Sequence, residues 1–245
     1  MGQWLGARLE RHAGREVRRY DTDWHFHRDW QVIHVTDGRR AFEWRGGGLT
    51  FGPKQTLILP PGLVHRGHST SEVSSFVMLY ASSDSLGISA PSSPTIVHDR
   101  KLTAAIIEVD TEHTREEKRE EIESILARVV SRGATTTWVP PVVSCVRAWL
   151  EEHHDSQCSF EELGRVRGCN PFYMSHLFRQ WVGLSPRAFR VQLRLLEARR
   201  RIALGQPLAS VAADLGFADQ SHLGRQFKRA FGLPPGLMAG LITGL

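Results

Sequence analysis

Three histidines are the side chains of this sequence best suited to chemistry. His25 and His27 stand one residue apart in the stretch HFHRDWQ, and His65 follows a Pro-Pro-Gly turn. Because side chains of an extended chain alternate between its two faces, His25 and His27 would point to the same side. Three neutral imidazoles are a plausible ligand set for zinc, iron, copper or nickel. Gln31 stands where a metal site often has a carboxylate, and a neutral amide cannot offset the charge of a cation.

Four uses of these histidines are open. A small organic effector that contacts them is the leading hypothesis, and ordinary packing in a protein core comes second. A metal ion ranks below both and catalysis ranks last, so we expect neither a metal nor a cofactor. Several tryptophans lie in the same part of the chain, and an aromatic-lined pocket would suit a sugar or an aromatic acid. The expected effector contacts are His25, His27, Gln31, Trp44 and His65.

The part of the chain that must position the histidines is predicted to be rich in strands. Between about residue 15 and residue 80 the apolar residues form the short runs VIHV, AFEW, LTF, TLIL and SFVMLY. Turn signals separate them, among them Asp37-Gly38, Gly52-Pro53 and Pro60-Pro61-Gly62. This pattern is typical of a β-meander or barrel. The small polar stretch 81–94 indicates a loop.

Helical signals follow this loop. Asp99 is placed to cap a helix that carries Leu102, Ile106 and Ile107, and Thr114 with Glu117 fits a capping box that opens a second helix. The second helix has one apolar stripe, formed by Ile122, Ile125, Leu126, Val129 and Val130. The stripe would either dock on the strand domain or form a homodimer seam. Pro140-Pro141 marks a domain boundary, which we place near residue 139.

The net charge is divided unevenly along the chain. Residues 1–139 hold 18 Lys or Arg and 18 Asp or Glu, whereas residues 140–245 hold 13 and 8, so the whole excess of +5 lies in the C-terminal part. Such asymmetry suggests a basic module whose partner is a polyanion. Neither a signal peptide nor a membrane span is expected, which predicts a cytoplasmic protein. Three cysteines without close-pair spacing favour neither disulfides nor a thiolate zinc site.

An internal repeat decides the interpretation of the C-terminal part. The segment SFEELGRVRGCNPFYMSHLFRQWVGLSP, from Ser159, aligns with PLASVAADLGFADQSHLGRQFKRAFGLPP, from Pro207. Each copy has the pattern of a short helix, a glycine turn and a second helix, which is the sequence form of a helix-turn-helix. The helix predicted between the copies has about 18 residues and a length of about 27 Å. Since one turn of DNA is about 34 Å, this helix could hold two recognition helices in successive major grooves.

Helical periodicity separates core residues from contact residues in the two recognition helices. The predicted buried stripes are Met174, Leu177, Phe178 and Trp181, and then Leu223, Phe227 and Phe231. Outside them, Arg225 could bind guanine, Gln220 adenine and Phe172 a thymine methyl group. Arg179 and Lys228 would hold phosphates. The full predicted DNA-contact set is Phe172, Ser175, His176, Arg179, Gln220, Ser221, Gly224, Arg225 and Lys228.

The passage GFADQSHLGRQFKRAFGLPP is close to a family signature in which Gly-Phe, Asp-Gln-Ser-His, Phe-Lys and Gly-x-x-Pro recur. Residues 141–240 thereby resemble the DNA-binding domain of the AraC/XylS family of bacterial transcription regulators. Gly224 and His176 depart from the family, which often has a longer polar residue and a basic residue there. The resemblance implies a preceding cupin-like barrel that binds an effector and keeps such histidines without a metal. Residues 20–80 resemble that barrel, with HFH in the first cupin motif and GPKQTLILPPGLVH after the second.

Together these patterns predict an α+β multidomain protein. We expect a cupin-like effector-sensing β-barrel at 1–95, a helical linker and dimerisation region at 96–139, and an all-α domain with two helix-turn-helix motifs at 140–245. The predicted function is sequence-specific DNA binding that regulates transcription in response to a small-molecule effector, without enzyme activity. Expected partners are double-stranded DNA, the effector and a second copy of the chain, with RNA polymerase as a further candidate and no membrane. The alternatives are a metal-dependent cupin enzyme and a regulator with no small-molecule effector.

Overall fold

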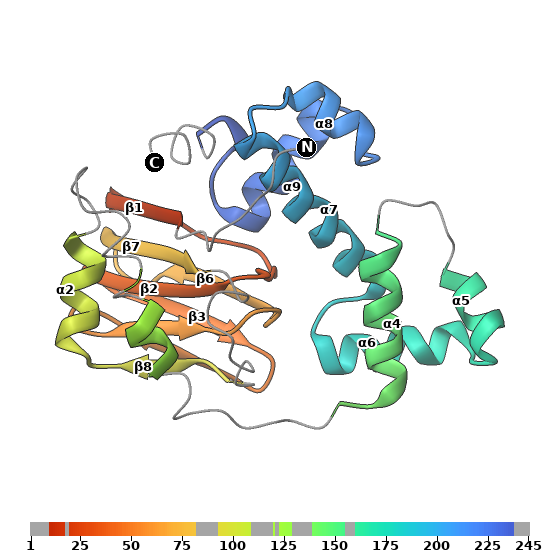
Figure 1. The fold of residues 1–245 in the computed structure, drawn as a ribbon, viewed down its shortest axis with the longest axis horizontal. Coiled ribbons are helices and arrows are strands. Elements are labelled where there is room, and N and C mark those ends of the chain that lie inside the picture. The colour runs from red at the N-terminus through yellow and green to blue at the C-terminus, as the bar shows by residue number, and fades with distance from the viewer. Residues whose placement is uncertain are drawn as a thin grey trace.

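The computed structural model describes residues 10–17, 20–81, 93–108, 120, 123–128, 139–154 and 160–237. Its N-terminal part is built of antiparallel strands and its C-terminal part of helices, which run from one side of the strands over their upper edge (Figure 1). The predicted α+β fold class, a β-sheet domain followed by a helical domain, is confirmed. None of the described helices is long and apolar enough to cross a membrane.

Two antiparallel sheets make up the strand domain. The larger sheet has the order β1-β7-β2-β5-β8 and the smaller has the order β4-β3-β6. The strands are β1 Glu10–Val17, β2 Trp30–Asp37, β3 Arg40–Trp44, β4 Gly47–Phe51, β5 Thr56–Leu59, β6 His65–Ser69, β7 Ser74–Ala81 and β8 Thr95–Val97. The five predicted apolar runs lie in β2, β3, β4, β5 and β7. β1, β6 and β8 were not predicted, because they are polar or very short.

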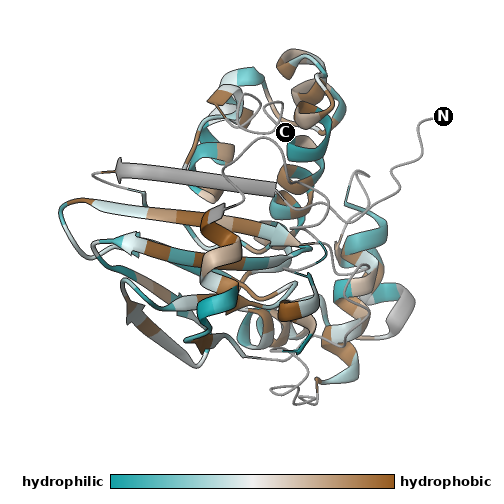
Figure 2. Ribbon diagram, turned by 60° about the vertical axis from the view of Figure 1, so that its left-hand side comes forward, coloured by the Kyte–Doolittle hydropathy of each residue, from teal (hydrophilic) through white to brown (hydrophobic). Residues whose placement is uncertain are grey.

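Alternation along the strands builds two hydrophobic layers. Ile33, Phe42 and Met78 belong to the cluster that fills the space between the two sheets. Val32 and Leu79, one position along from residues of that cluster, pack on the opposite face of the larger sheet. Figure 2 shows hydrophobic stretches along the strands beneath a helix that lies across them. The larger sheet is therefore covered on both faces.

The helix α2, Arg100–Glu108, covers the outer face of the larger sheet. Asp99 caps it as predicted, since its Oδ1 accepts hydrogen bonds from the backbone N–H groups of Lys101 at 2.9 Å and Leu102 at 3.0 Å. The helix carries Leu102, Ile106 and Ile107 as predicted; Leu102 and Ile106 are buried, whereas Ile107 is 47% exposed.

The predicted apolar stripe of the next helix is described in part. Residues 123–128 are helical, and Ile125 and Leu126 are buried in the same cluster as Leu102 and Trp30. This part of the stripe docks on the strand domain. Ile122, Val129, Val130, Thr114 and Glu117 lie outside the described residues, as does most of the predicted loop at 81–94.

The helical domain repeats one unit twice. Its helices are α4 Pro141–Glu152, α5 Phe160–Arg167, α6 Pro171–Val182, α7 Pro186–Ala203, α8 Leu208–Asp214 and α9 Gln220–Phe231. The turn glycines Gly168 and Gly216 have φ values of 62° and 70°, a left-handed conformation that glycine adopts without strain. α6 and α9 each begin at a side-chain cap, Asn170 and Asp219. Because the same local devices recur at the same places, both copies are helix-turn-helix units.

The helix α7 belongs to the cores of both units. Phe189 and Leu193, in its first half, are buried with Met174 and Phe178 of α6. Leu195, Ala198 and Ile202, further along, are buried with residues of α8 and α9. α7 has 18 residues, as predicted. The two units are thus held on one rigid rod of about 27 Å.

The strand domain packs against both helix-turn-helix units. Phe26 and Val64 are buried in the core of the first unit, where the rings of Phe26 and Phe189 stack with centroids 4.6 Å apart. At the second unit the Tyr20 hydroxyl donates to the carbonyl of Phe231 at 2.6 Å. These contacts fix the strand domain against both ends of the helical domain.

Replacing Phe26 by alanine should loosen this arrangement. The side chain is 1% exposed, and truncating a buried phenylalanine typically costs about 3–5 kcal/mol. Denaturant unfolding followed by tryptophan fluorescence should show a lower midpoint for Phe26→Ala. Phe172→Ala is the matched control, because that side chain is 82% exposed and its loss should change stability by less than about 0.5 kcal/mol. Equal midpoints for the two variants would contradict a stabilising contact at Phe26.

Candidate functional site

The segment that carries His25 and His27 runs across the mouth of the strand domain between β1 and β2. It is extended, but it forms only an isolated bridge, in which His25 and His65 exchange backbone hydrogen bonds of 2.9 and 2.8 Å. The expected alternation holds: His25 and His27 face the barrel interior, whereas Phe26 packs into the core of the first helix-turn-helix unit. One bridge is therefore enough to bring the first two histidines to the third.

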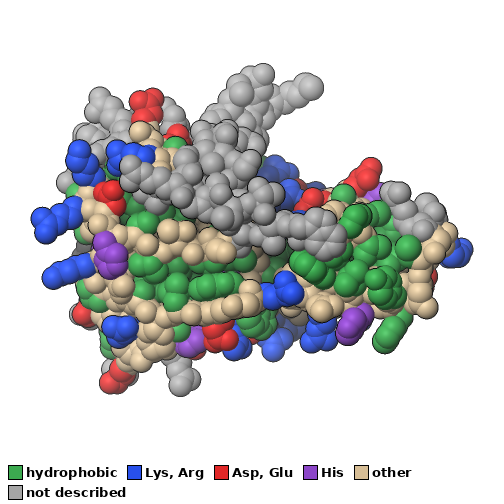
Figure 3. Space-filling model, turned by 90° about the horizontal axis from the view of Figure 1, so that it is seen from below, with side chains coloured by type: hydrophobic (Ala, Val, Ile, Leu, Met, Phe, Trp, Pro, Cys, Tyr) green, Lys and Arg blue, Asp and Glu red, His purple; other side chains and the backbone are tan. Residues whose placement is uncertain are grey.

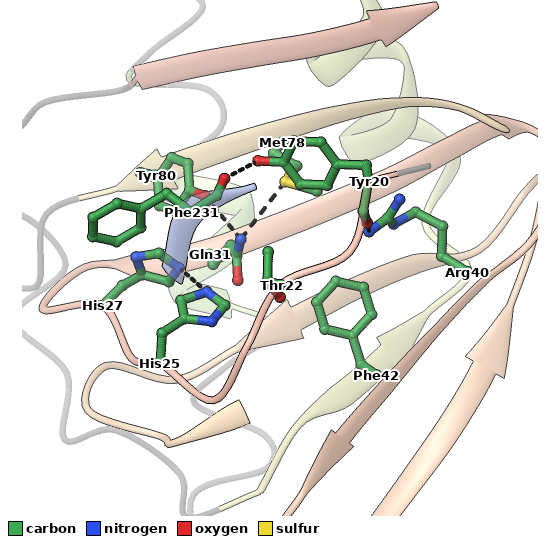
Figure 4. Close-up of a pocket in the computed structure, with 10 residues that line it drawn as sticks. All are labelled: Tyr20, Thr22, His25, His27, Gln31, Arg40, Phe42, Met78, Tyr80 and Phe231. Carbon is green, nitrogen blue, oxygen red and sulfur yellow. Dashed lines mark hydrogen bonds between the residues drawn. The ribbon is translucent and has the colours of Figure 1, made fainter. Parts of the chain in front are cut away.

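The three imidazoles converge in the barrel. One ligand nitrogen of each lies within 4.8 Å of those of the others, and all three side chains are buried. The Nε2 atoms of His25 and His27 are 3.1 Å apart and share a hydrogen bond, which is drawn as a dashed line in Figure 4. The ring centroids of His25 and His65 are 4.5 Å apart, and those of His27 and His65 are 5.5 Å apart.

Backbone carbonyls orient two of the rings. The Nδ1 of His25 donates to the carbonyl of Asp23 at 2.8 Å, and the Nδ1 of His65 donates to that of Leu63 at 2.9 Å. Since a carbonyl oxygen only accepts, each Nδ1 carries the proton and each Nε2 keeps its lone pair. Burial, reinforced by the neighbouring His65, lowers the pKa of His25 well below its usual value, and burial lowers the pKa of His65 to about 4. Both rings are therefore neutral at neutral pH.

A small cavity lies against the histidines. Its volume is about 10 Å³, and its wall is formed by Tyr20, Thr22, His25, His27, Gln31, Arg40, Phe42, Met78, Tyr80 and Phe231. Such a volume holds about one water molecule, whereas pockets for drug-sized organic ligands span about 300–1,000 Å³. In this conformation the cavity excludes any organic molecule of that size.

Of the five expected effector contacts, His25, His27 and Gln31 line this cavity, whereas His65 and Trp44 do not. Gln31 lines the cavity, where its Nε2 donates to the Tyr80 hydroxyl at 2.9 Å. Trp44 does not line it: the residue lies opposite His65 in the β3–β6 ladder and packs at the border of the barrel core. An aromatic residue was expected in the cavity wall near the histidines, and Tyr80 and Phe231 lie there instead of Trp44.

Arg40 is a cavity residue that sequence reasoning missed. It is fully buried in β3, where its Nη2 donates to the Tyr20 carbonyl at 2.7 Å and its Nη1 to Ser69 Oγ at 3.2 Å. The guanidinium also lies 4.7 Å from the centroid of the Phe76 ring. Burial lowers the pKa of Arg40 to about 10, so the group remains a cation at neutral pH. An arginine at the start of a strand gives no sequence signal that it will be buried.

The end of α9 closes the cavity from the other domain. The ring of Phe231 lies 6.1 Å from that of His25 and 6.0 Å from that of His27, measured between centroids. The N–H of Asp23 donates to the carbonyl of Arg229 at 2.8 Å, and the Asp23 carboxylate lies 3.6 Å from the Arg229 guanidinium. A methyl group on Gly232 would lie 2.9 Å from the Tyr20 ring, so the close approach requires glycine. α9 and the barrel mouth thus form one surface.

The outward faces of the recognition helices agree with the predicted periodicity. Met174 and Phe178 are buried in α6, with Leu177 and Trp181 partly buried, and Leu223, Phe227 and Phe231 are all buried in α9. Of the predicted contact residues, Ser175 and Gly224 are half-buried, and the exposed ones are Phe172, His176, Arg179, Gln220, Ser221, Arg225 and Lys228. Ser175 lines a groove with Leu150 and Phe160 instead of standing clear of the surface.

Acidic side chains of the barrel stand beside the basic face of α9. Arg225, Lys228 and Arg229 line an open groove together with Asp21 and Asp23. On the face seen in Figure 3, Lys and Arg side chains are spread over both domains with acidic side chains between them. The positive charge of α9 is thus partly opposed by the strand domain.

Comparison with known proteins assigns both domains. Residues 10–130 match the AraC-like ligand binding domain, and residues 163–239 match a helix-turn-helix domain family. The arabinose operon regulatory protein of Salmonella typhimurium is 32% identical over 101 residues, which cover 39% of this chain and 36% of that protein. The transcriptional activator RhaS of Pectobacterium carotovorum is 30% identical over 94 residues, which cover 38% of this chain and 34% of that protein. Each match thus spans little more than a third of the relative's length.

The whole described fold has a counterpart among solved structures. The crystal structure of ToxT from Vibrio cholerae O395 superposes with a TM-score of 0.68 at 12% identity, covering 98% of this chain and 99% of that chain. Two family matches in the expected order, together with a shared fold across both domains, establish the assignment. The chain belongs to the AraC family of transcription regulators, with an AraC-like ligand binding domain followed by a helix-turn-helix domain.

Proposed function

We propose that this chain is a sequence-specific DNA-binding transcription regulator whose promoter occupancy responds to a small effector held in the N-terminal barrel. One observation carries the proposal. The helix α9 presents Arg225 and Lys228 on its outer face and, at its end, places Phe231 over the buried histidines. The element suited to read DNA is therefore also the element that closes the effector cavity.

The geometry of the two units supports DNA binding. α7 is rigid and about 27 Å long, close to the spacing of about 34 Å between successive major grooves on one face of DNA. Arg225 and Gln220 are exposed and suited to guanine and adenine, and Phe172 is suited to a thymine methyl group. Arg179 and Lys228 would hold phosphates. His176, Ser175, Ser221 and Gly224 complete the proposed contact surface, where Gly224 leaves open space within 4 Å.

The effector would act through the contact between α9 and the barrel. Tyr20 and Asp23 hold the C-terminal end of α9, and the neighbouring carboxylates oppose its basic face. An effector that reshapes the barrel mouth would change these contacts and so the freedom of α9 to enter a groove. Related structures support a ligand in this fold, because one ToxT structure is described as bound to (E)-4-(8-methylnaphthalen-1-yl)but-3-enoic acid. A homodimer and contact with RNA polymerase remain parts of the proposal.

Replacing Arg225 by alanine should remove one element of base recognition. A bidentate contact between arginine and guanine contributes about 1–3 kcal/mol of discrimination, so binding to the preferred site should weaken about 5- to 150-fold. Sequencing of genomic fragments retained by the purified protein at physiological salt, followed by anisotropy titration of the enriched site, measures both motif and affinity. Lys101→Ala, on α2 of the strand domain, is the control and should retain the motif. Retention without a shared motif in the parent protein would contradict sequence-specific binding.

Replacing Asp23 by asparagine should strengthen DNA binding. The Asp23 carboxylate lies 3.6 Å from Arg229 and beside the basic face of α9, where it competes with phosphate. Exposed ion pairs contribute about 0.2–1 kcal/mol, so affinity should rise up to about 5-fold, and the gain should shrink as salt increases. Asp37→Asn makes the same charge change at the end of β2. If both variants bind equally well, the gain reflects net charge and not the position of Asp23.

A further inference from the structure

We infer that His25, His27 and His65 form a binding site for one divalent transition-metal ion of the zinc class, and that this ion is the effector of the barrel. This assignment replaces the organic effector expected from the sequence. The site itself stands on the geometry of the barrel, whereas the role of the ion as effector rests on the proposed function.

The spacing of the imidazole nitrogens fits a shared ion. An ion with nitrogen ligands at about 2.0–2.1 Å holds neighbouring ligand atoms about 3.3 Å apart in tetrahedral geometry. His25 Nε2 and His27 Nε2 are already 3.1 Å apart. The ligand atoms of the whole set lie within 4.8 Å of one another, so side-chain movements that close the widest separation by about 1.5 Å would complete the set.

The hydrogen bonds around the rings have the form found at metal sites. Metal-bound histidines almost always donate their second ring N–H to a carbonyl or carboxylate, which fixes the tautomer and aims the lone pair. His25 and His65 both do so, each to the carbonyl two residues earlier in the chain. The arrangement occurs twice, in two different segments. His65 Nε2 is left without a hydrogen-bond partner among the described residues, and His25 Nε2 accepts a hydrogen bond from His27 Nε2 that an ion would replace.

Two buried polar atoms, one in the histidine cluster and one in the cavity wall, have no hydrogen-bond partner among the described residues. His65 Nε2 is buried and has no hydrogen-bond partner there, and the same is true of Gln31 Oε1 in the cavity wall. An acceptor left unsatisfied in a protein interior destabilises the fold. An ion bound by the imidazoles would satisfy His65 Nε2, and water on that ion would be a donor for Gln31 Oε1.

The donor atoms and the volume of the cavity determine which class of metal ion fits. Three imidazoles suit Zn²⁺, Co²⁺, Ni²⁺, Cu²⁺ or Fe²⁺, whereas Mg²⁺ and Ca²⁺ prefer oxygen ligands throughout. The cavity of about 10 Å³ accommodates one ion or one water molecule.

Phe231 would transmit occupancy to the DNA-binding domain. Its ring packs on His25 and His27, two of the three rings that would hold the ion. Its carbonyl is held by Tyr20, another residue of the cavity wall. Movement of the imidazoles therefore changes the contacts of Phe231. This residue is the last of α9 and lies three residues beyond Lys228.

Titration of the full-length, chelator-treated protein with Zn²⁺, and with Co²⁺ as a visible absorption probe, tests the site. We expect one ion per chain and Co²⁺ bands typical of nitrogen ligation. His65→Gln should weaken binding at least about 100-fold. His34→Gln is the matched control, because His34 is also buried in the strand domain but lies outside the cluster, where it bonds Thr56 at 3.1 Å. The affinity of this variant for the ion should equal that of the parent.

Two results would overturn the site: no stoichiometric binding by the parent, or equal binding by the parent and His65→Gln. The second result would place the ion on surface histidines such as His153 and His154. Circular dichroism checks that His65→Gln is folded, and His27→Gln serves as the second variant if it is not.

A DNA-binding measurement tests the effector role separately. Affinity for the enriched site should change at least about 5-fold between Zn²⁺ and chelator, the lower end of typical allosteric coupling, and His65→Gln should abolish the change. If the ion binds as expected while DNA affinity stays constant, the effector role is wrong and the site stands. If no DNA is retained under any condition, the proposed function fails, and the ion titration still decides the site.

Discussion

The burial of imidazole and guanidinium groups beneath the end of α9 is the constraint on which the rest of the structure depends. Buried polar groups must find partners or destabilise the fold. Two histidines use backbone carbonyls next to them in the chain, and Arg40 uses the carbonyl of Tyr20. Tyr20 in turn bonds the carbonyl of Phe231. The polar interior of the barrel is therefore completed by a residue of the helical domain, and the two domains cannot be understood as independent units.

The helix α7 connects this closure to the first helix-turn-helix unit. Phe189, near its start, stacks on Phe26 of the segment that carries the histidines, and Arg199, near its end, lies 4.5 Å from the centroid of the Tyr80 ring in the cavity wall. Its residues also fill the cores of both units. Because one rigid helix touches the barrel at both ends, a change at the barrel mouth bears on the position of both recognition helices and not on α9 alone.

Individual residues show which features of the fold the sequence patterns predicted and which they missed. Strands with apolar runs were predicted, whereas β6 was missed because His65 and its neighbours are mostly polar and only one face is buried. The alternation of His25, Phe26 and His27 was right although the segment is not a regular strand, since an extended backbone is sufficient for alternation. Periodicity identifies a face of an element but not how far a neighbouring element covers it: Ile106 is buried and Ile107 exposed on one helix, and Trp44 lies outside the cavity wall.

The sequence by itself determined the tandem helix-turn-helix, the length of α7, the outward side chains of α6 and α9, and the convergence of three histidines. These features depend on near neighbours in the chain: helix caps, glycine turns and residue periodicity. Only the tertiary structure decided that Phe231 roofs the histidines, that Arg40 is buried beside them, and that the cavity holds about one water molecule. The bond between Tyr20 and Phe231 joins residues 211 positions apart, and no local pattern encodes which distant surfaces will meet.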